Sequence, residues 1–416
     1  MSSSFFWPEK NRIESILLIA LPLIGGMFSQ TVLNLIDTAM VSRLENSDAA
    51  LAAVGYGGFI LFTAQALILG LSTGVLACSA RRKGENRIEE TAYFLNAALL
   101  IIAAITPIIA FSVYVFSERF FPIINDDPQV IREGVPYLQA RAIGIIFVCC
   151  NFAFRGFWNA LNMTKIYLIT MVSMHILNVI LNYALIFGNL GAPQLGVEGA
   201  GLASTLSVFL GTVIYFSIAF RRARHLGFLR KLPQVAEIFT LLKLSLPNGL
   251  QQLFFSTGFL ATFWIIGKIG TPEVAAANIL VNLMLAAMLP SMALGLSAAS
   301  LVGQALGKNN IEDASLWGWD VAKIAVFFLG ALGIIFAVFP ETIVSSLYFA
   351  ETNTLQLTLW PMRLVGVFMS VEALGIVMQN ALLGAGDTKR VMTISTINQW
   401  FIFLPLAYFA GPVLGL

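Results

Sequence analysis

The residue with the clearest chemical potential is Asp37, an acid that stands inside a long apolar stretch of the chain. A charged side chain deep in a bilayer costs roughly 2.5–3.5 kcal/mol on insertion scales, so such an acid is paired, hydrated or protonated. Gln30, Asn34 and Asp37 follow i, i+4, i+7 spacing, which places them on one face of a helix. The pattern predicts a polar stripe that could bind and release a proton or another cation.

A second polar stripe is formed by His175, Asn178 and Asn182, which follow i, i+3, i+7 spacing. Two polar faces in a bundle solvated by lipid should point at each other or at water. The alternative is that amides and a packed histidine serve only as hydrogen-bonding contacts between helices. That alternative suits the asparagines and His175, but it suits the carboxylate of Asp37 poorly.

Glu372 is the other acid deep in an apolar stretch. Arg363 precedes it by nine residues, and Arg141 occupies the corresponding place in the first half of the chain. Glu372 therefore has two interpretations, as a second functional acid or as one partner of a structural ion pair. Asp320 and Lys323, at i, i+3, are expected to form a local ion pair.

Motifs of soluble enzyme chemistry are missing from the sequence. It contains no HExxH, no GxSxG and no phosphate-binding GxxxxGK[ST]. Gly384-Ala385-Gly386-Asp387 matches the GxGD of intramembrane aspartyl proteases, but those enzymes need a second aspartate at the same depth. Asp387 falls at an expected helix end beside Lys389, so the motif is not expected to be catalytic. We expect no enzyme, no metal site and no cofactor other than a coupling ion.

Composition indicates that lipid is the solvent of this chain. Of 416 residues 58% are hydrophobic and 11% are charged, whereas a soluble domain carries about 25% charged residues. A net charge of +2 gives no reason to expect a nucleic-acid partner. The N-terminus lacks a small-residue cleavage site ahead of the first apolar run, which argues against a cleaved signal peptide.

A membrane-spanning helix needs about 20 mainly apolar residues. On this basis we expect eleven spans, at 14–42, 51–79, 91–116, 136–160, 166–188, 199–220, 239–268, 274–304, 316–339, 358–384 and 389–411. Prolines inside a helix remove a backbone hydrogen bond and favour a bend. Such prolines stand at Pro22, Pro107, Pro247, Pro290 and Pro405.

Lys and Arg are distributed unevenly between the loops. If the N-terminus is cytoplasmic, sixteen basic residues fall in cytoplasmic segments and four in the opposite loops. Because basic loops stay in the cytoplasm, the N-terminus is expected there. Residues 221–243, the most basic stretch, would then connect the two halves on the inner side.

The chain repeats itself after about 225 residues. Leu21-Pro22 corresponds to Leu246-Pro247, and the LGLS at residue 69 corresponds to the LGLS at residue 294. A constant offset indicates an internal duplication. Six spans separate the repeats, so both halves enter the bilayer in one direction and should be related by an axis along the membrane normal.

The expected fold is therefore an all-α polytopic membrane protein with two pseudo-symmetric six-helix lobes. The N-terminal lobe is expected at 1–220, a cytoplasmic linker at 221–238 and the C-terminal lobe at 239–416. The second lobe offers five helices, because the sequence ends at 411–416 where a twelfth span would begin.

The chain resembles the multidrug and toxic compound extrusion (MATE) transporters, with most likeness to their DinF-like bacterial branch. The resemblance is carried by Leu21-Pro22 with Asp37, by the pair Asn178 and Asn182, by GVEGAGLAS at 196–204 and by GAGDTK at 384–389. It extends over nearly the whole chain. It implies two six-helix lobes around a cleft that opens alternately to either side.

The resemblance also implies roles for particular residues. In the family the aspartate of the first span couples transport to an ion, and polar residues of the fifth and sixth spans complete that site. These positions are Asp37, Asn178, Asn182 and Ser204 here, whereas some relatives carry a second acid at the position of Asn182. Other relatives use acids on the seventh and tenth spans. Glu372 fits the tenth span, but the seventh offers only glutamines.

We therefore expect a monomeric secondary antiporter of the bacterial inner membrane that exports small organic, mainly cationic, compounds in exchange for protons or sodium. Membrane lipids and drug-like molecules would be its partners. Gln30, Asn34, His175 and Glu372 are expected to line the substrate cavity, and Pro22 is expected to act as a hinge. The alternatives are a flippase for lipids or lipid-linked oligosaccharides from the same superfamily and, less consistent with the duplication, a channel.

Overall fold

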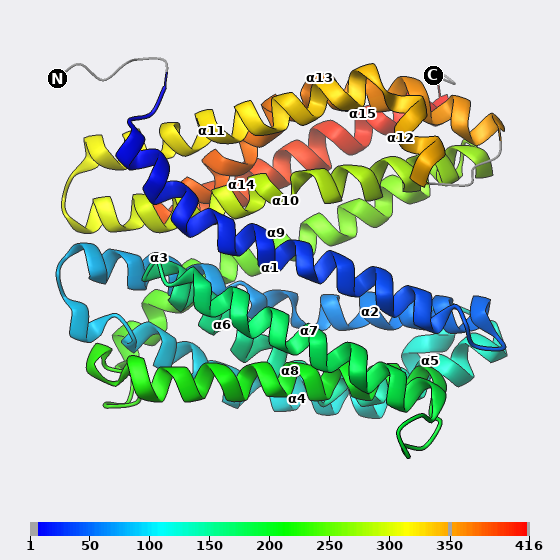
Figure 1. Ribbon diagram of the computed structural model, residues 1–416, viewed down its shortest axis with the longest axis horizontal. Coiled ribbons are helices and arrows are strands. Elements are labelled where there is room, and N and C mark those ends of the chain that lie inside the picture. Colours follow the sequence, from blue (N-terminus) through cyan, green and yellow to red (C-terminus); the bar gives the residue numbers. More distant parts are fainter. Residues whose placement is uncertain (1–6, 348–351, 414–416) are drawn as a thin grey trace. The chain divides into compact units, whose positions relative to one another are not determined.

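The computed structural model describes residues 7–347 and 352–413, and within these ranges all regular secondary structure is helical (Figure 1). Ten helices are long and apolar enough to cross a membrane, and a bent helix pair raises the number to eleven. The expected all-α membrane fold is thereby confirmed, and the eleven expected spans correspond to the count that takes the bent pair as one span. Of the C-terminal stretch 411–416, the last three residues lie outside the described ranges.

In the described part of the chain the helices follow one another without strands between them. Their bounds are α1 (Lys10–Val41), α2 (Ser47–Leu69), α3 (Leu71–Gly84), η1 (Ile88–Glu90), α4 (Tyr93–Ile124), α5 (Pro128–Ala142), α6 (Ile145–Ala160), α7 (Thr164–Phe187), α8 (Gly196–Arg222), η2 (Arg224–Leu226), α9 (Val235–Gly267), α10 (Thr271–Gly307), α11 (Ile311–Val338), α12 (Pro340–Leu347), α13 (Thr352–Ala385), α14 (Thr388–Thr396), η3 (Ile397–Phe403), α15 (Leu404–Tyr408) and η4 (Phe409–Val413).

The chain divides into two compact units, and the divisions fall inside helices. One unit contains residues 1–24 and 250–416, and the other contains residues 25–249. The divisions after Ile24 and after Gly249 are 249 − 24 = 225 residues apart, which is the offset of the sequence repeat. Each division follows a proline, Pro22 in α1 and Pro247 in α9, by two residues.

The unit of residues 25–249 is a bundle in which α7 packs on α8, α3 on α6, and α5 on α2, α4 and α8 (Figure 1). Its core is rich in aromatic side chains. Phe154 stacks on Tyr215 with ring centroids 5.4 Å apart, and both side chains are almost completely buried, as are Phe157 and Trp158. Large buried rings of this kind fix the relative positions of α6 and α8.

The first part of α9 packs closely against the junction of α2 and α3. Added Cβ atoms at Gly70 and Gly74 would meet atoms of Ser245, Gly249 and Leu241. Thr73 Oγ1 also donates a hydrogen bond of 3.1 Å to Asn248 Oδ1. Small residues at i, i+4 allow helices to approach closely, and Gly70 and Gly74 make such a contact with α9.

Replacing Gly70 with Val should lower the free energy of unfolding by about 1–3 kcal/mol, because the added atoms would overlap backbone atoms that cannot rotate away. Thermal unfolding in detergent measures the effect. Gly58, where an added Cβ meets nothing within 4 Å, provides the matched control. Equal melting temperatures for Gly70→Val and Gly58→Val would contradict this account of the helix contact.

The fourth span departs from the prediction. It was expected as one helix over 136–160, but the helix begins at Pro128 and consists of two parts, α5 and α6, that meet at an angle of 51°. The side chain of Asp127 accepts a 2.8 Å hydrogen bond from the backbone N–H of Gln129, and Pro128 occupies the first helical position. An N-cap aspartate followed by proline is a typical helix start. The other predicted spans each overlap an observed span.

In the unit of residues 1–24 and 250–416, α10, α11 and α13 pack against one another. The start of α1 is held to α11 by a charged cluster. Arg12 Nε lies 2.5 Å from Asp320 Oδ2, and Arg12 Nη1 lies 2.7 Å from Asp313 Oδ1. Lys323 lies 3.7 Å from Asp320, which confirms the expected local pair, but Arg12 is the closer partner. The Arg12 guanidinium also lies 3.7 Å from the centre of the Trp317 ring.

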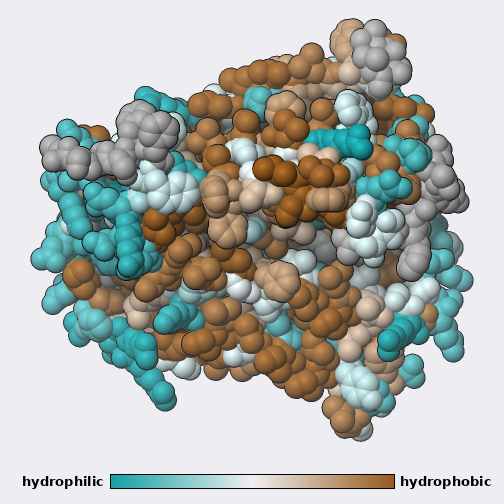
Figure 2. Space-filling view, turned by 45° about the horizontal axis from the view of Figure 1, so that its top comes forward, coloured by the Kyte–Doolittle hydropathy of each residue, from teal (hydrophilic) through white to brown (hydrophobic). Residues whose placement is uncertain are grey.

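Apolar side chains cover much of the surface, as Figure 2 shows for one face, where hydrophilic side chains gather towards the margins. Leu18, Phe111, Phe327 and Phe401 are among the large hydrophobic residues whose side chains are exposed. A water-soluble protein does not expose so much contiguous apolar area. The chain is therefore a multi-pass membrane protein.

Candidate functional site

Asp37 near the end of α1 belongs to a continuous series of polar contacts with α7 and α8. Asn182 Nδ2 donates a 2.7 Å hydrogen bond to Asp37 Oδ1 and lies 2.9 Å from Asn178 Oδ1. Asn178 Nδ2 in turn donates to Ser204 Oγ at 3.4 Å. The four residues expected to form the coupling site therefore lie together, although their role in coupling stays a prediction.

Either of the two asparagines beside Asp37 can donate a hydrogen bond to its carboxylate. If the Asn178 amide is turned by half a rotation, its nitrogen lies 3.1 Å from Asp37 Oδ1 and its oxygen accepts from the backbone N–H of Ser204 at 3.3 Å. The carboxylate can thus receive a hydrogen bond from either asparagine. Asn182 and Asn178 are buried, whereas Asp37 is only partly buried. The amide donors stabilise the charged form of the Asp37 carboxylate. Because the side chain is only partly buried, a proton from solvent can still bind to it.

The predicted cavity residues of α1 and α7 also meet. His175 Nε2 lies 3.2 Å from Gln30 Oε1, and Gln30 Nε2 donates a 3.0 Å hydrogen bond to Asn34 Oδ1. His175 Nδ1 also lies 2.6 Å from Ser29 Oγ, a contact that the spacing of polar residues does not predict. The two polar stripes face each other, as expected. His175 is therefore part of an interhelical hydrogen-bond network, which is the simpler of its two interpretations.

Glu372 belongs to the other unit, on α13, and is partly buried. Within residues 7–347 and 352–413 it forms no ion pair, and the side chain of Arg363 is exposed. The structural pair with an arginine is therefore not formed. In the same described ranges no group of three or more His, Cys, Asp or Glu side chains could hold a metal ion.

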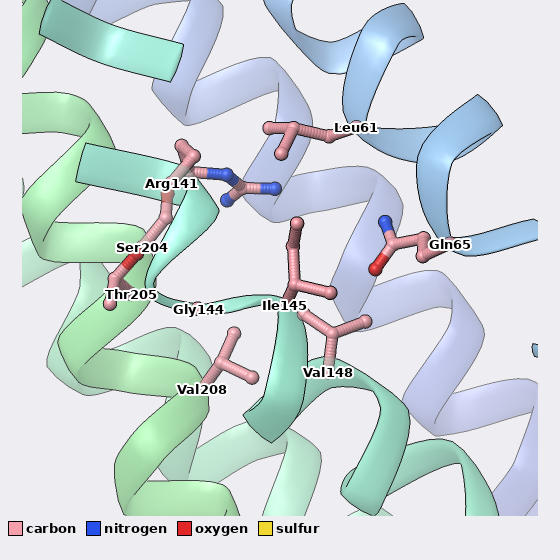
Figure 3. Close-up of a pocket in the computed structure, with 9 residues that line it drawn as sticks. All are labelled: Leu61, Gln65, Arg141, Gly144, Ile145, Val148, Ser204, Thr205 and Val208. Carbon is pink, nitrogen blue, oxygen red and sulfur yellow. The ribbon is translucent and has the colours of Figure 1, made fainter. Parts of the chain in front are cut away.

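Two residues of the same unit, Arg141 and Gln65, were missed as site residues. Arg141, at the end of α5, interacts electrostatically with Asp37, and together with Gln65 of α2 it lines a small hollow. Figure 3 shows the Arg141 guanidinium extending towards Leu61, with the Gln65 amide at the opposite side of the hollow. Ser204 lies on the wall of the same hollow. The sequence contained one signal, an arginine inside the apolar span expected at 136–160.

Comparison with protein families supports the duplication. The family model described as MatE matches residues 22–184 and again residues 247–409. The two matches begin at Pro22 and Pro247, so their offset is 247 − 22 = 225, the offset found in the sequence. Together they cover most of the chain.

Individual proteins are similar to this chain along most of its length. The chain is 26% identical over 408 residues to the probable multidrug resistance protein NorM of Thermotoga maritima. The aligned region covers 95% of this chain and 85% of that protein. It is 27% identical over 413 residues to the multidrug resistance protein NorM of Burkholderia vietnamiensis, covering 96% and 87%. A MOP superfamily transporter from Pyrococcus furiosus has the same fold, with a TM-score of 0.88, 20% identity, and coverage of 97% and 90%.

Proposed function

Because the chain belongs to the MatE family, we propose that it is a secondary antiporter that exports small organic, mainly cationic, compounds by alternating access. The observation that carries the proposal is the hydrogen-bond series Asp37–Asn182–Asn178–Ser204, which surrounds a single carboxylate in a membrane span with amide and hydroxyl groups. The names of the NorM relatives, which are multidrug resistance proteins, support drug-like compounds as substrates.

In the proposed mechanism, ionised Asp37 attracts the positive charge of a bound compound. When the site opens to the outside, a proton binds to Asp37, the attraction is lost and the compound is released. Asn182 and Asn178 can serve both states, because a side-chain amide donates to a carboxylate and accepts from a carboxylic acid. Differential binding of the substrate to the two protonation states supplies the coupling.

We infer that protons are the coupling ion. Some relatives carry a second acid at the position that is the neutral Asn182 here, so this site offers a sodium ion one charged ligand fewer. We also propose that the protein lies in the bacterial inner membrane as a monomer with its N-terminus in the cytoplasm, which the distribution of Lys and Arg favours. The lobes 1–220 and 239–416 and the DinF-like branch stay predictions.

The hinge is proposed at Pro22, which is buried and stands two residues before the point where α1 passes from one compact unit to the other. Pro22→Ala restores a backbone hydrogen bond and should stiffen α1. We expect the maximal transport rate to fall about tenfold, or ~1.4 kcal/mol in the barrier, while substrate affinity changes little. Transport rates and equilibrium binding measured on the same protein test this. Unchanged turnover would exclude a hinge at this residue.

The proposed function is tested by transport of a fluorescent organic cation into vesicles that contain the purified protein. Proton and sodium gradients are imposed separately, and a vesicle preparation without protein sets the background. Transport that follows the proton gradient supports the proposal. If folded protein moves no cation under either gradient, the proposal fails and the flippase becomes the leading alternative.

A further inference from the structure

The break in the fourth span places a helix start inside the membrane. α5 ends at Ala142 and α6 begins at Ile145, so the break lies near the middle of the span from residue 128 to residue 160. No side chain caps the first turn of α6. The first N–H groups of a helix lack partners within the helix and carry a partial positive charge. Broken membrane helices in transporters use such starts to hold anionic groups of substrates.

The same break is lined by a guanidinium. Gly144, Ile145 and Val148, from the cap and first turn of α6, share the hollow with Arg141 (Figure 3). In the described part of the chain Arg141 forms no salt bridge, although it interacts electrostatically with Asp37. A helix start and a guanidinium therefore converge on one hollow, and both favour a negatively charged group there.

Polar side chains complete the wall. Gln65 is only 8% exposed, and its Oε1 has no hydrogen-bond partner. A buried amide without a partner costs free energy, which is recovered when a ligand or water binds it, and an amide can present either its nitrogen or its oxygen. Ser204 accepts from Asn178, which leaves its hydroxyl hydrogen free to donate. Ser204 thereby joins the hollow to the hydrogen-bond series of Asp37.

Size limits what can enter. The hollow has a volume of about 10 Å³, roughly the room for one water molecule, so it admits one small group and not a whole organic molecule. One oxygen atom of an acidic group, met by donors on several sides, fits this description. Arg155 of α6 lies over the Phe152 ring at 4.2 Å and is not part of the wall.

We propose that Arg141, Gln65, Ser204 and the start of α6 form an anion subsite that binds the acidic group of the exported compound, so that the transporter favours zwitterions. The inference rests on the proposed function and specifies its substrate class. The ammonium end of a zwitterion pairs with Asp37 and its carboxylate with Arg141. Protonation of Asp37 then releases the ammonium end of the zwitterion, while Arg141 stays positively charged.

The test uses two rhodamines that differ at one group. Rhodamine 110 carries a free carboxylate, whereas rhodamine 123 is its methyl ester and is cationic. Proton-driven transport of each dye is measured in vesicles for the wild type, Arg141→Gln, Arg141→Lys and Gln65→Leu. Arg363→Gln, at an exposed arginine of α13 in the corresponding place of the second half, is the matched control.

We expect Arg141→Gln to lower the ratio of rhodamine 110 to rhodamine 123 transport at least tenfold, Gln65→Leu to lower it less, and Arg141→Lys to retain most of it. Arg363→Gln should leave the ratio unchanged. An equal loss of both dyes in Arg141→Gln, or an unchanged ratio, overturns the anion subsite.

Two further measurements distinguish a substrate carboxylate from free chloride, and failure of the subsite from failure of the proposed function. If the anion is free chloride, exchange of chloride for gluconate slows rhodamine 123 transport by the wild type but not by Arg141→Gln, and this result overturns the assignment to a substrate carboxylate. The variant Asp37→Asn distinguishes failure of the proposed function from failure of the anion subsite. If that variant transports both dyes normally, the proposed function is wrong, whereas a loss of both dyes together with an unchanged ratio in Arg141→Gln refutes only the subsite.

Discussion

Replacing Asp37 with Asn should reduce gradient-driven efflux to the rate of vesicles without protein. Asparagine has nearly the same shape as aspartate, but it neither ionises nor binds a proton, so it can neither attract a cation nor exchange it for one. The fold should be preserved, because Asn182 Nδ2 can still donate to the side-chain oxygen at position 37. Efflux of a fluorescent cation under an imposed proton gradient measures the effect.

The matched control for this variant is Asp387→Asn. Asp387 is an aspartate at the start of α14 whose carboxylate lies 3.3 Å from Arg390, outside the proposed site. It should retain efflux close to that of the wild type. Thermal unfolding of both variants shows whether they are folded. Efflux driven by the gradient in folded Asp37→Asn would rule out this residue as the coupling group.

Replacing Arg12 with Met should lower the free energy of unfolding by about 2–3 kcal/mol, because it leaves the carboxylate of Asp320 buried without its closest partner. The side chain of Asp320 is 8% exposed and that of Arg12 is 18% exposed. The expected loss stays below that of a fully buried pair, since Lys323 remains 3.7 Å from Asp320. Unfolding of the purified protein in detergent, followed by temperature or denaturant, measures the change.

A double variant shows whether the loss of stability comes from the unpaired charge or from lost packing. If the penalty comes from the uncompensated charge, Arg12→Met combined with Asp320→Leu should recover part of the stability, because an apolar pair replaces a broken ionic pair. Arg43→Met, at an exposed arginine in the turn that follows α1, is the control and should change stability little. A double variant that is less stable than Arg12→Met alone would show that packing around Trp317, and not charge, holds the start of α1.

This cluster bears on function because it attaches one end of α1 to α11. The first part of α1 belongs to the unit of residues 250–416, whereas the part that carries Asp37 belongs to the unit of residues 25–249. A helix anchored at one end and functional at the other can transmit a local change at Asp37 along its axis. Pro22 lies between the two parts.

The sequence alone determined the local elements. Apolar runs of about 20 residues predict membrane helices, because backbone groups in lipid must be hydrogen-bonded within their own segment. The repeat of 225 residues predicted the duplication that the family matches at 22–184 and 247–409 confirm. The spacing along α1 and α7 also predicted which polar side chains share a face, because helical periodicity is a property of consecutive residues.

Only the tertiary structure decided what depends on contacts between distant residues. Arg12 meets Asp320 across 308 positions, and periodicity carries no information about such a partner. The break at Gly144 spans too few residues to interrupt an apolar pattern, so the sequence predicted one helix where α5 and α6 meet at an angle. Packing against α2 and α8 places Gln65 and Ser204 around that break. Helix periodicity fixes which side chains share a face, but packing alone fixes what that face meets, and the hollow at Arg141 exists only through such packing.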